Sequence, residues 1–116
     1  MAIPSGSGTE VLKRASVHAN SDAYATIITG VANHIYTVLS VVACEVAGAT
    51  ESLAMRIDIS AAGSNQIFLF PNQQVAGDGT FVWNDKFVLT GTDKLEVYNS
   101  AGNVDWYVSY IDQDWT

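Results

Sequence analysis

Residues Gly79 to Trp115 read GTFVWNDKFVLTGTDKLEVYNSAGNVDWYVSYIDQDW and give the clearest indication of the fold class. It contains segments rich in Val, Phe, Tyr, Trp and Leu, separated by polar clusters that hold Gly, Asn or Asp. That rhythm is typical of short strands joined by turns. We expect strands over 81–89, 94–99 and 104–111. Consecutive antiparallel strands of this kind form a meander or part of a Greek key.

Alternation supports these strands. Apolar residues fall on one side of each expected strand, as half-buried strands require. In 81–89 they are Phe81, Trp83, Phe87 and Leu89, and in 104–111 they are Val104, Trp106, Val108 and Tyr110.

The remainder of the chain continues the pattern. Further strands are expected over 11–17, 23–29, 35–46, 53–59 and 66–70, with Pro71 ending the last because proline cannot donate to a sheet ladder. About eight short strands at regular spacing predict an all-β protein, an antiparallel β-sandwich of jelly-roll type. We expect one domain over 11–116, preceded by an extended N-terminal arm over 1–10 that is rich in Ser and Gly.

The expected strand 35–46 is apolar on both of its faces. One face would carry Ile35, Leu39, Val41 and Ala43, and the other Tyr36, Val38, Val42, Cys44 and Val46. A strand of a single sandwich normally has one wet face, so a loop of this chain or another subunit must cover the outside. The sequence has no long helix to serve as cover, which favours a subunit. Ile35, Leu39, Val41 and Ala43 are the predicted interface.

Composition excludes several function classes. The 116 residues carry 12 acidic and 5 basic side chains, a net charge of −7, so no basic patch can neutralise a phosphate backbone and nucleic-acid binding is not expected. Charged residues make up only 15% of the chain, which leaves an uncharged polar surface. Cys44 is the single cysteine and is expected to be a small buried hydrophobe.

No targeting or membrane segment is recognisable. Residues 1–10 lack the basic start and apolar middle of a signal peptide, and the apolar stretch 31–47 is too short and too polar to span a bilayer. The sequence predicts a protein that is made in a cytoplasm, stays soluble and does not bind membranes.

The search for a catalytic or metal site finds none. His18 and His34 have no partner at a metal-pair or nucleophile-and-base spacing, and both are expected in solvent or bonded to loops. Acids are concentrated in the last third, yet none has the spacing of a calcium loop. Arg56 and Asp58 are expected as a solvated pair on the outward face of strand 53–59. The sequence therefore predicts no enzymatic activity and no cofactor.

Aromatic side chains are the remaining binding candidates, because flat rings give contact area at low entropic cost. Trp83 and Trp106 fall on the expected core faces. Tyr107 shares its face with Asp105 and Ser109, and Trp115 lies near the last residue. Tyr107 and Trp115 are thus the aromatic residues expected to be exposed.

The pattern of the last third also resembles a known family. The strand Leu95-Glu96-Val97, the glycine turn and the strand 104–110 resemble the C-terminal half of small β-sandwich virion proteins of tailed bacteriophages. The resemblance implies a capsid decoration (cement) protein, assembled as a homotrimer on the outer capsid surface of the virion and made in the host cytoplasm. It further implies that the arm, through Ile3 and Pro4, helps to clamp the major capsid protein.

Two other functions stay open at this point. One is a carbohydrate- or receptor-binding sandwich of a tail fibre or lectin-like protein, which would use exposed aromatics such as Tyr107 and Trp115. The other is a metal enzyme of jelly-roll type, which has less support because such chemistry needs a cluster of histidines.

Overall fold

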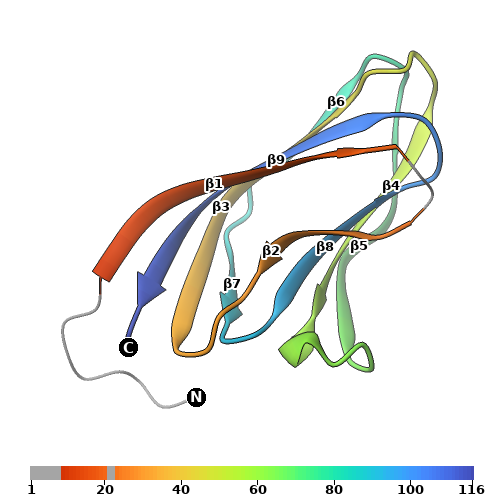
Figure 1. Cartoon of the computed structure of the whole chain (residues 1–116). Helices are drawn as coiled ribbons and strands as arrows, with labels where there is room; N and C mark the ends of the chain where they lie inside the picture. Colours follow the sequence, from red (N-terminus) through yellow and green to blue (C-terminus); the bar gives the residue numbers. More distant parts are fainter. Residues whose placement is uncertain (1–8, 21–22) are drawn as a thin grey trace.

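The computed structural model describes residues 9–20 and 23–116, and within them the chain forms nine strands and one turn of 3-10 helix (Figure 1). The strands are β1 (Thr9–Ala19), β2 (Ala25–Thr29), β3 (His34–Glu45), β4 (Glu51–Asp58), β5 (Gln66–Val75), β6 (Thr80–Trp83), β7 (Phe87–Thr90), β8 (Lys94–Asn99) and β9 (Val104–Asp114). The 3-10 turn spans Ile59–Ala61.

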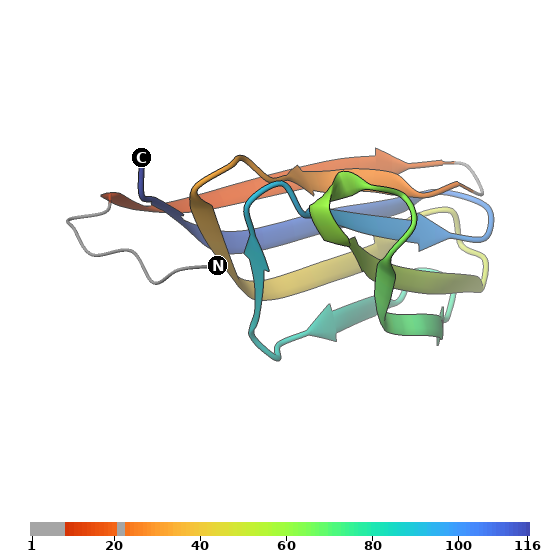
Figure 2. The same cartoon turned by 90° about the horizontal axis from the view of Figure 1, so that it is seen from below.

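The strands form two antiparallel sheets that face each other as the layers of a sandwich (Figures 1 and 2). Sheet A has the order β1-β9-β3-β6, with β7 also paired to β3, and sheet B has the order β2-β8-β4-β5. If β6 and β7 count as one interrupted strand, this is the eight-stranded arrangement of a jelly roll. The predicted fold class is confirmed.

The core lies between the two sheets and is built from the inward phase of each strand. Trp106 and Val108 of β9 pack there with Leu53 and Met55 of β4, all at most 1% exposed. Alternate residues of the expected strand 104–111, among them Trp106 and Val108, therefore point into the core as predicted. Phe81, Trp83, Phe87 and Leu89 also all contact or belong to this core.

One expected strand is divided in two. The segment 81–89 was expected to be continuous, but β6 ends at Trp83 and β7 begins at Phe87, and both halves pair with β3. The indole N–H of Trp83 donates to the carbonyl of Asp85 at 2.9 Å and stabilises the bend between them. The two halves keep the same inward phase because three residues separate them.

Strand β5 runs past Pro71, which does not end it. β5 is an edge strand, and its pairing with β4 is irregular around the proline, between Phe70 and Gln73. An edge strand tolerates proline because one side of its backbone has no ladder partner. The expectation that the strand stops at Pro71 is therefore wrong.

A β-bulge in β3 changes the faces of its residues. The pairing of β3 with β9 shifts between Val38 and Ser40, so Leu39 is the extra residue. A bulge of one residue reverses the alternation beyond it. Tyr36 and Val38 point inward before the bulge, whereas Val41, Ala43 and Glu45 point inward after it.

Candidate assembly face

The outer face of sheet A, the side turned away from sheet B, is apolar and uncovered by any described part of the chain. Its large exposed side chains are Leu12 (71% exposed), Val88 (52%), Val82 (48%) and Tyr107 (41%). The register places Ile35, Val42 and Ile111 on the same side, between these residues. We call this surface the assembly face. It comprises Leu12, Ile35, Leu39, Val42, Val82, Val88, Tyr107 and Ile111.

Charge is sparse across the assembly face. The outward residues of β3, β6 and β7 are hydroxyl-bearing, apolar or Cys44, with no charged side chain among them. Arg14 on β1 points outward, Glu10 and Asp105 lie toward opposite ends of the β1–β9 pair, and Asp85 and Lys86 are exposed in the link between β6 and β7. For a chain of net charge −7 this face is unusual, and it lacks the charges with which soluble sheets discourage contact.

A hollow of about 410 Å³ indents the assembly face where β1, β9 and the β3 bulge meet. Leu12, Leu39 and Tyr107 give it an apolar lining, and Arg14 stands beside them. Ser109 and the strand residue Lys13 complete it. The bulge makes this hollow possible, because it turns the Leu39 side chain outward.

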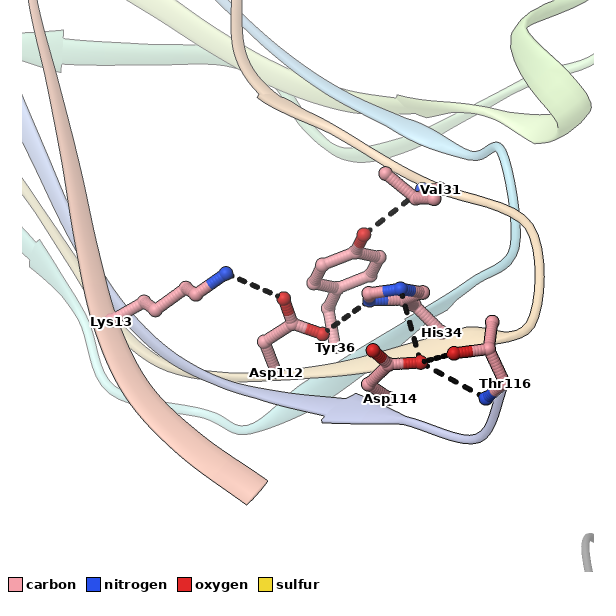
Figure 3. Close-up of polar contacts among 7 residues, drawn as sticks. All are labelled: Lys13, Val31, His34, Tyr36, Asp112, Asp114 and Thr116. Carbon is pink, nitrogen blue, oxygen red and sulfur yellow. Dashed lines mark hydrogen bonds and ion pairs between the residues drawn. The ribbon is translucent and has the colours of Figure 1, made fainter. Parts of the chain in front are cut away.

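A charged network fixes β1 against the rest of sheet A (Figure 3). The Nζ of Lys13 donates to Oδ2 of Asp112 at 2.8 Å, and Nδ1 of His34 lies 2.7 Å from Oδ1 of the same carboxylate. These side chains come from β1, β9 and β3, so one carboxylate joins three neighbouring strands. Asp112 is only 5% exposed, which makes the arrangement a built feature of the sheet end.

Tyr36 and Asp114 contact the imidazole of His34 and orient it (Figure 3). Its ring stacks on Tyr36 at a centroid distance of 5.8 Å, and its Nε2 lies 3.4 Å from Oδ1 of Asp114. The same Asp114 oxygen accepts hydrogen bonds from the hydroxyl and backbone N–H of Thr116. The Tyr36 hydroxyl accepts the N–H of Val31 at 2.9 Å, which ties the β2–β3 loop to the network.

The electrostatics of this network favour anchoring over chemistry. Burial by itself would raise the pKa of Asp112, but the hydrogen bonds and charges of Lys13 and His34 outweigh it and lower that pKa. The Asp112 hydrogen bond in turn raises the pKa of Lys13. Burial raises the pKa of Tyr36, which disfavours a nucleophilic phenolate. The ionised pair thus stabilises the end of sheet A.

Another buried carboxylate organises the loops at the other end of β3. Glu45 is 1% exposed and accepts backbone N–H groups from Ala47, Gly48, Ala49 and Asp78, at 2.7 to 3.1 Å. These bonds, with the one from Asp78 foremost, lower the pKa of Glu45. One side chain therefore holds two loops that are separate in sequence.

We find no candidate metal site among the described residues. Within residues 9–20 and 23–116, no three His, Cys, Asp or Glu side chains lie close enough together to hold an ion. The described chain also contains no helix of the length and apolarity needed to cross a membrane.

The four predicted interface residues do not share one face. Ile35 and Leu39 lie on the outer side of sheet A, but Val41 is 2% exposed and Ala43 is 1% exposed, both in the core. The expected alternation is wrong beyond Leu39 because of the bulge. Val42 and Cys44 replace Val41 and Ala43 on the outside, so Cys44 is half-buried on the outer side of sheet A instead of in the core.

The remaining predicted site residues are placed as follows. Tyr107 is 41% exposed and lines the hollow. Trp115 is partly buried, with its backbone N–H donating to the carbonyl of Asn33 at 3.0 Å. Ile3 and Pro4 lie outside the described residues. Their role in capsid contact stays a prediction.

Sequence reasoning missed the roles of His34 and Asp112, although a signal was present. His18 is exposed beside Asp105, as expected of a solvated histidine, whereas His34 is largely buried on Asp112. In β9 the inward phase runs Val104, Trp106, Val108, Tyr110 and then Asp112. An acid that continues a core phase calls for a buried partner, and Lys13 continues the inward phase of β1 in the same way.

These features define the class of the protein: a jelly-roll β-sandwich with one open apolar face and internally satisfied carboxylates. The sequence matches the model of the YKOF-related Family over residues 6–66, which is more than half of the chain. The chain belongs to the YKOF-related Family. No curated protein sequence matches it.

Two solved structures share the fold at low sequence identity. A chain of the Bacillus endospore appendages, which form disulfide-linked pili, has 13% identity and a TM-score of 0.56, with 100% of this chain and 97% of that one covered. A chain of the T13 IBDV viral particle has 9% identity and a TM-score of 0.53, with 92% and 36% covered. At these identities the likeness establishes the sandwich fold alone.

Proposed function

We propose that this chain is a non-enzymatic structural subunit that forms a multi-copy assembly through the outer face of sheet A. The observation that carries the proposal is the uncovered assembly face. Four large side chains, Leu12, Val82, Val88 and Tyr107, are each more than 40% exposed on one sheet surface. Contiguous apolar surface of this kind marks interaction sites on soluble proteins.

The polar chemistry of the chain supports a structural role. The carboxylates of Glu45 and Asp112 are bonded to backbone N–H groups or to cationic partners within the chain. Asp93 likewise accepts the N–H groups of Ser60 and Thr90. Carboxylates engaged in this way stabilise loops and strand ends, and they are poorly suited to proton transfer with a substrate.

The finer proposal is a capsid decoration protein of a tailed bacteriophage, as the sequence resemblance implies. In that role the chain forms a homotrimer, contacts the major capsid protein and stabilises the shell from outside, with 1–10 as an arm and 11–116 as the domain. Apolar residues lie at both edges of this face, so copies of the chain can associate edge to edge into a closed ring. The β1 edge carrying Leu12 can meet the β7 edge carrying Val88 of the next copy.

A pilus-like polymer is the second candidate, because the match to the endospore appendage chain spans both chains nearly end to end. A linear polymer joined by disulfides needs at least two cysteines in each subunit. These 116 residues contain Cys44 alone, which can join one subunit to one other. A filament built from this chain would therefore be held by non-covalent contacts.

Light scattering on the purified protein tests the proposal. We expect wild type to form a concentration-dependent oligomer and Val88→Asp to be monomeric, because a charge on the assembly face would be buried without a partner. Ile67→Asp is the matched control: Ile67 is 50% exposed and Val88 52%, but Ile67 lies on β5 of sheet B. A monomeric wild type, or equal behaviour of the two variants, would overturn the assembly face.

Negative-stain electron microscopy of the oligomer separates the finer candidates. Closed rings of uniform size support a decoration-type assembly, whereas open filaments support the pilus-type assembly. Cys44→Ser should leave the oligomer intact in either case, since its contacts are non-covalent.

A further inference from the structure

The outer face of sheet B carries two aromatic rings beside one guanidinium, and a third ring packs against one of these two. The Cζ of Arg56 lies 3.5 Å from the ring centroid of Tyr24 and 6.0 Å from that of Phe68. The rings of Tyr24 and Tyr98 are 5.1 Å apart, centroid to centroid. We call Tyr24, Arg56, Phe68, Glu96 and Tyr98 the aromatic shelf.

The sheet itself assembles the shelf from separate segments. Arg56 on β4 is the Cα partner of Phe68 on one side and of Glu96 on the other. Tyr98 follows two residues after Glu96, in the same outward phase of β8, and Tyr24 comes just before β2. Strand pairing therefore fixes the order of Phe68, Arg56 and Glu96 across the sheet.

Arg56 is not the solvated partner of Asp58 that the sequence suggested. Its Nε donates to Oε1 of Glu96 at 2.8 Å, and the two side chains are only 17% and 14% exposed. Asp58 is 5% exposed and accepts the N–H of Gly63 instead. The ion pair of the shelf is therefore held firmly and neutralises its own charge.

The shelf has unused hydrogen-bonding capacity. A guanidinium has five N–H donors, and within the described chain only Nε of Arg56 makes a hydrogen bond. Glu96 uses only Oε1 there. Donors and an acceptor thus stand side by side, next to the exposed ring of Phe68 (46% exposed).

We propose that the aromatic shelf binds a neutral saccharide. Two adjacent sugar hydroxyls can accept from the Nη groups of Arg56 and donate to Glu96, which a planar donor fork beside a carboxylate fits well. The C–H face of the sugar ring packs against Phe68, whose flat apolar surface loses little entropy on binding. Glu96 and the net charge of −7 disfavour an acidic sugar at this place.

The shelf and the assembly face lie on opposite outer sides of the sandwich, since they belong to different sheets (Figure 2). Association through sheet A leaves sheet B facing outward, so saccharide binding does not depend on the proposed function. Light scattering reports on assembly and titration reports on the shelf, so either proposal can fail alone.

The test is a titration of the ¹⁵N-labelled protein, followed by NMR, with neutral hexasaccharides of glucose, mannose, galactose and xylose. Sialyllactose serves as the acidic arm. We expect at least one neutral sugar to shift amide resonances of β4, β5 and β8, and sialyllactose to shift them less. If no neutral sugar produces shifts there, or sialyllactose binds more tightly, the proposal is wrong.

Three variants sharpen the test. Phe68→Ala and Arg56→Lys should each weaken binding about tenfold or more, since lysine keeps the charge but loses the planar fork. Val46→Ala is the matched control, because Val46 is 47% exposed and Phe68 46%, and Val46 follows β3 outside both the shelf and the assembly face. Native melting temperatures with unchanged binding in Phe68→Ala and Arg56→Lys would overturn the proposal, as would an equal loss of binding in Val46→Ala.

Discussion

The two outer faces of this sandwich differ in the side chains that occupy their outward phase. Sheet A presents Leu12, Val82 and Val88 with few charges, whereas sheet B presents an ion pair enclosed by aromatic rings. Both sheets pack on the same core, and in both of them inward and outward residues alternate along the strands. The comparison teaches that in a jelly roll the core determines the fold, while outward residues determine what each side can contact.

The largest expected effect comes from removing the support common to both faces. Leu53→Ala creates a cavity at a residue that is 0% exposed, and it should lower the free energy of unfolding by about 2–5 kcal/mol. Urea unfolding measures this loss. Val46→Ala, at a side chain that is 47% exposed and outside the assembly face, should change it by less than about 0.5 kcal/mol. Similar losses in the two variants would contradict the packing described.

The Asp112 network should stabilise sheet A and not sheet B. Asp112→Asn removes the charge that binds Lys13 and His34 and should lower the free energy of unfolding by about 1–3 kcal/mol. Hydrogen exchange should rise in β1 and stay unchanged in β4 and β8. Equal exchange increases in both sheets would show that the network is not specific to sheet A.

Acid should lower the free energy of unfolding by protonating the buried carboxylates of Asp112 and Glu45. The folded pKa of Asp112 is lowered, so its contribution to stability is full above the unfolded pKa and is lost as pH falls through the folded pKa. Glu45 has a lowered pKa and acts in the same direction. Urea unfolding measured from neutral pH down to about pH 3 should show this loss, with a smaller slope in Asp112→Asn. If Asp112→Asn lost stability with falling pH as steeply as wild type, Asp112 would not be a source of the acid sensitivity.

The smallest expected effect is at the ion pair of sheet B. Glu96→Gln keeps the shape of the side chain but removes its charge, and it should lower the free energy of unfolding by about 1 kcal/mol or less. Oligomeric state should not change. Thermal unfolding together with light scattering checks both statements, and a dissociated Glu96→Gln protein would show that the two faces are coupled.

The sequence was sufficient for features that depend on local periodicity. The phases of β4 and β9, with Leu53 and Trp106 in the core, follow from alternation, and the jelly roll follows from the number and spacing of strands. The bulge at Leu39 could not be read in this way. A register shift depends on the partner strand, and one extra residue exchanges Val41 with Val42 between core and surface.

The sites were less accessible than the fold for a related reason. The pairs Lys13 with Asp112 and Arg56 with Glu96 join strands that are 99 and 40 residues apart in sequence. The order of the strands in each sheet brings these residues together, and sequence periodicity does not predict that order. The sequence indicates such a pair only where a charged residue, such as Asp112, occupies a core-facing position of an apolar strand.

The pairing of β1 with β9 also bears on how the protein folds. The first strand of the described chain completes its ladder only with the last one, from Thr9 opposite Asp114 to Ala19 opposite Val104. Closing so long a loop is slow, and β1 has no other ladder partner until β9 has been synthesised. During synthesis β1, with Val11 and Leu12, is therefore exposed to aggregation until β9 follows.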